Sequence, residues 1–212
     1  MSPDAVVFDT THIELAEIRA EDEYAGTRAM LPARLGTALL RLQIDIGRAD
    51  AVWPAPNRRA YPTLLDFPAP EILVYPHEAV VAEKLEAMVV LGDRNSRIKD
   101  YFDLDHLAAK LEFDRAKLAE AVRRTFARRG TPIPTAAPIG LTPAYWENPS
   151  RPAQVRAFSR RAGIANTDPP GATLQPRLAS FLLPVLAAAH SGERRTAVWP
   201  PGGPWMEPGK SG

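Results

Sequence analysis

The 212-residue sequence contains no cysteine, which excludes a disulfide framework and any metal site built on thiolates. It has no uninterrupted apolar run of the roughly 18 residues that a membrane-spanning helix needs. The N-terminus also lacks the pattern of a secretory signal peptide. We therefore expect a cytoplasmic protein with no membrane partner.

A strong excess of charge of either sign is missing as well. The formal net charge is only +1 at pH 7, so the chain has no overall basic signal for nucleic acid. Any affinity for a polyanion has to be local. Hydrophobic residues make up 45% of the sequence and charged residues 24%, as in an ordinary globular protein.

Proline, in contrast, is abundant. The 22 prolines are about twice the usual share, and many lie in residues 54–76, in residues 131–152 and after residue 169. Because proline interrupts helices and strands, we expect irregular connections in these stretches. The C-terminal tail, residues 191–212, is low in complexity, and we expect it to be disordered.

Hydrophobic periodicity divides the rest of the chain into strands and then helices. The clearest strand is LLRLQIDIG, residues 39–47, where apolar and polar side chains alternate; this predicts a half-buried strand with Asp45 on its polar face. Helices are expected over residues 77–91, 95–110, 114–129, 142–146, 152–162 and 173–189. Asn95 or Ser96 can cap the second of these helices, and Asp114 can cap the third.

This order predicts an α+β fold in which a sheet domain, residues 1–75, precedes a helical domain, residues 76–190. Two charges stand out in the helical part. On ideal helices Lys84 and Asp100 each lie within about 40° of several apolar neighbours. The simplest interpretation is that they face each other, or one polar ligand, where the helices meet. A buried structural ion pair is an equally good interpretation.

Three further residues lie near this pair in the sequence. Asp103 follows Asp100 by one helical turn and borders the same face. Arg94 and Arg97 lie in or beside the preceding loop, where guanidinium groups could meet phosphates at a helix N-terminus. Taken alone, each of the three is better explained as a surface residue.

Two other sequence patterns are weaker evidence for a functional site. The Asp-Leu-Asp at 103–105 looks like a metal-binding pair, but residues two apart on a helix diverge by about 200°, so their carboxylates cannot share a metal ion. The basic stretch RRTFARR, residues 123–129, could follow a nucleic-acid backbone. A solvated helix end is the better explanation.

The sequence around Asp45, Lys84 and Asp100 resembles that of the AbiEii/AbiGii-type nucleotidyltransferase toxins of bacterial abortive-infection and toxin–antitoxin systems. The stretches that carry the resemblance are YAGTRAMLPARLGTALLRLQIDIGRAD, YPHEAVVAEKLEAMVVLGDRNSRIKDYFDL and TFARRGTPIP. They occur in the expected order and cover most of residues 5–186. AEKLEA and NSRIKDYFDL are the most specific of them.

The resemblance implies a partial nucleotidyltransferase-like mixed sheet followed by a helical C-terminal half. It implies that Asp45 is a metal-binding catalytic carboxylate and that Lys84 and Asp100 are catalytic, with Lys84, Arg94, Arg97 and Asp103 binding the nucleotide. Such enzymes use Mg²⁺ and a nucleoside triphosphate, and they transfer a nucleotidyl group to an acceptor, which is tRNA in related toxins. A cognate antitoxin is the expected partner.

The sequence departs from the family pattern at one point. Family members carry a Gly-Ser or Gly-Gly segment followed by an Asp-x-Asp pair on a strand, and neither occurs before Asp45. We therefore expect an N-terminally truncated protein that is inactive alone and exposes an apolar sheet face. The alternative is a non-catalytic remnant or binding module whose helical half contacts an antitoxin or RNA.

Overall fold

A computed structural model describes residues 5–18, 26–47, 52–164 and 170–207. The chain forms two compact units, residues 1–50 and 51–212, and each is described by itself. The predicted division at 75/76 differs from this one by a hairpin, residues 57–74, which belongs to the second unit. Whether the units are independent domains stays a prediction.

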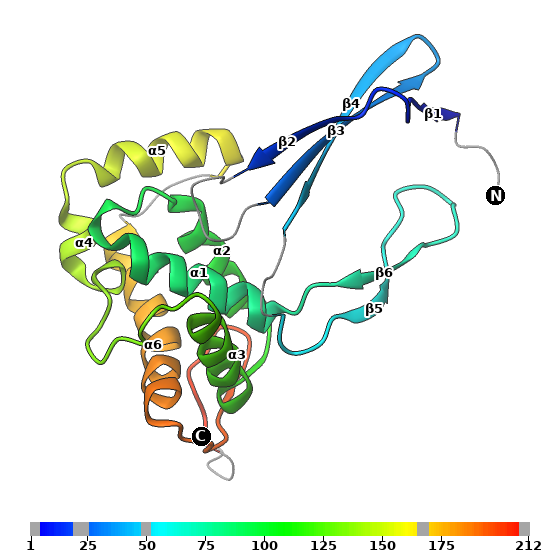
Figure 1. Cartoon of the computed structure of the whole chain (residues 1–212). Coiled ribbons are helices and arrows are strands. Elements are labelled where there is room, and N and C mark those ends of the chain that lie inside the picture. The colour runs from blue at the N-terminus through cyan, green and yellow to red at the C-terminus, as the bar shows by residue number, and fades with distance from the viewer. Residues whose placement is uncertain (1–4, 19–25, 48–51, 165–169, 208–212) are drawn as a thin grey trace. The chain divides into compact units, whose positions relative to one another are not determined.

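The first unit is an antiparallel sheet (Figure 1) built around one long central strand. Its strands are β1 (Val6–Phe8), β2 (Glu14–Ile18), β3 (Gly26–Leu35) and β4 (Ala38–Ile46). β4 pairs with β3 along its whole length, and a two-residue turn beginning at Gly36, with φ of 58°, joins them. β1 and β2 pair with the other edge of β3.

Alternation along β4 separates an apolar face from a polar one, as the sequence predicts. The apolar face is open, however, because Leu40, Leu42, Ile44 and Ile46 expose 39%, 37%, 47% and 47% of their surface. The predicted half-buried strand is therefore exposed within its unit. This finding agrees with the expected exposed apolar face.

The second unit contains two small sheets and a helical body. The strands are β5 (Asn57–Ala60), β6 (Glu71–Val74), β7 (Phe113–Asp114) and β8 (Val198–Trp199). β5 pairs with β6 and β7 with β8. All the strand pairings of the described residues are antiparallel, so the parallel pairs of a mixed sheet are not found there.

The helices fall close to where the sequence places them. They are α1 (His77–Leu91), α2 (Ile98–Lys110), α3 (Arg115–Arg128), α4 (Pro143–Glu147), α5 (Arg151–Ala162) and α6 (Pro170–Ser191), with short 3₁₀ turns at Gly92–Arg94 and Ile139–Leu141. Asp114 caps α3 by accepting a hydrogen bond from the Lys117 amide at 2.8 Å. The α+β fold class is confirmed.

The predicted cap of α2 is wrong. Arg97 occupies the N-cap position without a side-chain cap. The Asn95 side chain instead accepts a hydrogen bond from the Arg97 amide at 2.9 Å, which forms a turn before the helix.

The core of the second unit lies where α3 packs against α1 and α6, and where α2 packs against α6 (Figure 1). Residues 172–191 of α6 are long and apolar enough to cross a membrane by length and composition. Phe181, Leu182 and Val185 of this segment are nevertheless fully buried inside the unit. We therefore treat α6 as a core helix.

The expected disorder of residues 191–212 is wrong for the part that the structure describes, which ends at Glu207. Trp199 of β8 is only 3% exposed, and its indole nitrogen donates to the Ala108 carbonyl at 2.8 Å. Its ring contacts those of Phe181 and Trp205. Gly203, with φ of 74°, lies against the indole where a β-carbon would clash. Burial of aromatic surface thus holds a segment whose composition predicts disorder.

Candidate functional site

Lys84 and Asp100 meet between α1 and α2, as their positions on two apolar faces predict. The Lys84 ammonium lies 2.6 Å from one carboxylate oxygen of Asp100 and 2.7 Å from Asp103. The Lys84 side chain is 18% exposed and that of Asp100 only 8%. The predicted contact is therefore confirmed, and it includes the neighbouring aspartate.

Two more cations complete this group, which we call the Lys84 cluster: Lys84, Arg97, Lys99, Asp100 and Asp103. Lys99 pairs with Asp103 along α2, and Arg97 Nε lies 2.9 Å from the second oxygen of Asp100. That oxygen is buried, and its contact with Arg97 lacks hydrogen-bond geometry. One buried carboxylate oxygen therefore has charge compensation but no donor.

Opposing effects set the charge state of the cluster. Burial lowers the pKa of Lys84, but hydrogen bonds to Asp100 and Asp103 outweigh it, so this pKa lies above its ordinary value. Burial raises the pKa of Asp103, but hydrogen bonds from Lys84 and Lys99 outweigh it, so that pKa is lowered. Lys84 and Asp103 are therefore both charged at neutral pH.

A network that sequence reasoning missed holds the loop before α2. Arg151, only 3% exposed, donates to the Asn95 carbonyl at 2.8 Å and also contacts Asp93. Its guanidinium lies 3.8 Å from the centre of the Tyr145 ring, whose hydroxyl donates to the same Asn95 carbonyl. The loop is thus fixed from the protein side, while Arg94, between Asp93 and Asn95, is exposed. Because these partners are 50 to 58 residues apart in the sequence, hydrophobic periodicity could not predict their contacts.

A second missed network lies elsewhere on α1. Glu86 is 5% exposed and accepts hydrogen bonds from Arg129 at 2.8 Å and from the Thr131 hydroxyl at 2.6 Å. Glu86 and Lys84 are two residues apart and point about 200° away from each other. A helix buried on most sides therefore places one ion pair on each of two faces. The apolar residues on both sides of Glu86 in the sequence could have indicated that its side chain is buried.

The two acids of the Asp-Leu-Asp sequence serve different partners. Asp103 contacts Lys84 and Lys99, whereas Asp105 forms two hydrogen bonds, at 2.8 and 2.7 Å, with Arg177 of α6. Their carboxylates diverge as the helical geometry requires, so they cannot chelate one metal ion together.

Asp45 belongs to the first unit, where it lies on the polar face of β4. Arg28 Nε and Nη2 donate to its two oxygens at 2.8 and 2.9 Å, and the Gln43 amide lies 3.2 Å away. Within the described residues, no group of three histidine, aspartate or glutamate side chains could hold a metal ion. Mg²⁺ does not require such a group, since one or two carboxylates together with substrate phosphates and water often hold it, and the metal-binding role of Asp45 stays a prediction.

The basic stretch at the end of α3 is largely neutralised within the protein. Glu120 accepts from Arg123 and from Arg124, the latter at 2.6 Å, and Arg129 binds Glu86. Arg124 also lies 5.5 Å from the centre of the Trp53 ring. These contacts argue against a nucleic-acid surface, although Arg123 and Arg129 are held in ion pairs and are only 26% and 18% exposed rather than fully solvated as predicted.

Comparison with known proteins gives one clear match. A family model described as "Nucleotidyl transferase AbiEii toxin, Type IV TA system" matches residues 3–182. No curated protein and no solved structure shows significant similarity to the chain. The match covers both units, including the strand with Asp45 and the helices with Lys84 and Asp100. The chain therefore belongs to the AbiEii nucleotidyltransferase toxin family of type IV toxin–antitoxin systems.

Proposed function

We propose that the Lys84 cluster binds the phosphates of a nucleoside triphosphate during transfer of a nucleotidyl group to an acceptor such as tRNA. Membership of the family implies a nucleoside triphosphate as substrate and a cognate antitoxin as partner. In this role Lys84 contacts the phosphates directly. Asp100 and Asp103 position its ammonium group, while Arg94 and Arg97 contact the outer phosphates.

The geometry around the Lys84 ammonium carries the proposal. A lysine has three N–H donors, and two of them are directed at Asp100 and Asp103. The third donor and an 18% exposed side chain leave access for one phosphate oxygen. The carboxylates fix the position of a cation before any ligand arrives, so little reorganisation is needed on binding.

The charge balance of the cluster supports an anionic ligand. Lys84, Arg97 and Lys99 carry three positive charges against the two negative charges of Asp100 and Asp103. The nearby Arg94 adds a further cation at the exposed loop. Guanidinium groups suit phosphate because they can bind two of its oxygens at once.

We further propose that the 212-residue chain is inactive by itself. Nucleotidyl transfer in this family is expected to use Mg²⁺, and the described residues contain no group of three metal-binding side chains. Asp45 already binds Arg28, and one carboxylate cannot hold a pair of catalytic ions.

Transfer of label tests these two proposals together with the alternative, a non-catalytic binding module. The purified chain is incubated with each of the four α-³²P-labelled nucleoside triphosphates, Mg²⁺ and total tRNA. We expect no labelled RNA, although calorimetry detects nucleotide binding. Labelling that Asp45→Ala abolishes would contradict the inactivity. Absence of both labelling and nucleotide binding would favour the module.

A further inference from the structure

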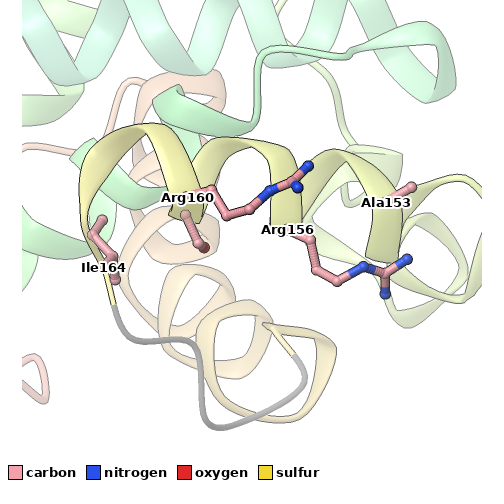
Figure 2. Close-up of a pocket in the computed structure, with 5 residues that line it drawn as sticks. Ala153, Arg156, Arg160 and Ile164 are labelled. Atoms are coloured by element: carbon pink, nitrogen blue, oxygen red, sulfur yellow. The ribbon is translucent and has the colours of Figure 1, made fainter.

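A hollow of about 440 Å³ lies along α5, and none of the residues that line it belongs to the Lys84 cluster. Its lining residues are Ala153, Arg156, Ser159, Arg160 and Ile164. Figure 2 shows Arg156 and Arg160 on successive turns of α5, with both side chains extending toward the turn that carries Ala153. The hollow therefore has a cationic side formed by one helix.

These two arginines differ from the arginines of α3. Both are exposed, and neither has an acidic partner within the part of the chain that the structure describes. Residues 148–164 contain four arginines and no acidic residue. Of these arginines, Arg151 is buried beneath the loop before α2, which leaves Arg156, Arg160 and Arg161 to create a local positive surface. A net charge of +1 for the chain conceals this local excess.

Ser159 provides an independent sign that the hollow receives a ligand. It is only 5% exposed, and its hydroxyl oxygen is buried without a hydrogen-bond partner. Burying a hydroxyl without a partner is unfavourable. Because the same residue lines the hollow, a hydrogen-bond acceptor bound between the arginines can satisfy it.

We propose that this face of α5 binds the phosphate backbone of an RNA acceptor. The proposal rests on the proposed function, in which the acceptor is an RNA. Arg156 and Arg160 are four residues apart, about 6 Å along the helix axis, so each can contact a different phosphate group of one strand. Ser159 donates its hydroxyl hydrogen to a phosphate oxygen, and Ala153 and Ile164 provide apolar contacts at the ends of the hollow.

Fluorescence anisotropy with a labelled RNA hairpin that has a single-stranded 3′ end tests the proposal without any nucleotide or turnover. We expect Arg156→Gln/Arg160→Gln to weaken binding at least tenfold in 100 mM salt. It should also reduce the slope of log affinity against log salt by about two, because two phosphate contacts are lost. Ser159→Ala should weaken binding severalfold with little change in that slope.

The matched control is Lys110→Gln/Arg194→Gln, which removes the same charge from exposed positions outside α5. It should bind RNA within twofold of the wild-type protein. Equal losses in both double variants would overturn the proposal, as would unchanged binding by the α5 variant. Circular dichroism melting verifies that each variant is folded.

Competition separates a polymer backbone from a single phosphate. Millimolar inorganic phosphate or nucleoside triphosphate should not displace the RNA, and complete displacement would contradict a backbone site. Nucleotide binding by the α5 variant should equal that of the wild-type protein. Failure of the RNA site is thereby distinguished from failure of the Lys84 cluster, which alters nucleotide binding alone.

Discussion

Each of the two units contains an ion pair that includes a predicted site aspartate, Asp45 or Asp100, and the two pairs lie in very different surroundings. In the first unit Arg28 and Asp45 are 39% and 42% exposed on a sheet face. In the second unit Lys84 and Asp100 are 18% and 8% exposed between two helices. Water screens the first pair, whereas the second is held where electrostatic interactions are strong.

The distance between two charged groups does not by itself describe an ion pair. Both pairs approach within 3 Å, at 2.8 and 2.6 Å. Only in the second pair does removal of the cation leave a buried carboxylate without a hydrogen-bond donor, and that loss is costly. The apolar packing around the pairs differs in the same way, with an open face on the sheet and a continuous core in the helical unit.

The largest expected effect comes from that difference in packing. Leu182→Ala should destabilise the second unit by about 4 kcal/mol, because truncating a fully buried leucine leaves a cavity. The same substitution at Leu39, which is 74% exposed, should change stability by less than about 0.5 kcal/mol. Urea unfolding followed by tryptophan fluorescence measures the first effect, since all four tryptophans lie in residues 51–212. Hydrogen exchange across β3 and β4 measures the second.

The next largest effect concerns removal of the cation from each of the two ion pairs. Lys84→Met should destabilise the second unit by about 3 kcal/mol, since it leaves the buried Asp100 carboxylate with Arg97 nearby but with no hydrogen-bond donor. Arg28→Met should leave hydrogen exchange in the first unit nearly unchanged. Lys99→Met, which removes a 68% exposed lysine of the same cluster, is the matched control and should have little effect. A loss of stability for Arg28→Met as large as that for Lys84→Met would show that the two ion pairs do not differ as proposed.

A smaller effect is expected from pH. The pKa of Asp103 is lowered in the folded protein, so its stabilisation is present above the ordinary aspartate pKa of about 3.9. It disappears as pH falls through the lower, folded value. The pKa of Lys84 is raised, so its contribution holds below about 10.4 and disappears as pH rises through the higher, folded value.

The effect of Asp103 on stability can be measured at acidic pH. Urea midpoints of the second unit, recorded from pH 7 to pH 2.5, should decline more steeply in the wild-type protein than in Asp103→Asn. Identical pH profiles would mean that Asp103 does not contribute to stability through its charge.

Local features of the fold were predictable from the sequence. The bounds of α1 follow from Pro76 before it and Gly92 after it, and the capping of α3 by Asp114 follows from short-range hydrogen bonding. The meeting of Lys84 with Asp100 followed from a simple conflict, because each charge interrupts an apolar helix face. Such a conflict is resolved only by a partner of opposite charge or by a ligand.

The missed features depend on contacts between distant segments. Arg151 reaches back 56 residues to the Asn95 carbonyl, and Glu86 is satisfied by residues 43 and 45 positions later. Trp199 is buried although its surroundings are rich in proline and glycine. Composition describes the flexibility of an isolated segment, but it does not reveal an aromatic side chain that the core can receive.

The most direct test of the phosphate-binding role is a calorimetric titration of ATP, GTP, CTP and UTP, each with Mg²⁺, into the wild-type protein and Lys84→Met. At temperatures where both proteins are folded, we predict that at least one nucleotide binds to the wild-type protein and binds at least tenfold more weakly to the variant. No binding to the wild-type protein, or equal binding to both, would show that Lys84 and Asp100 form a purely structural ion pair.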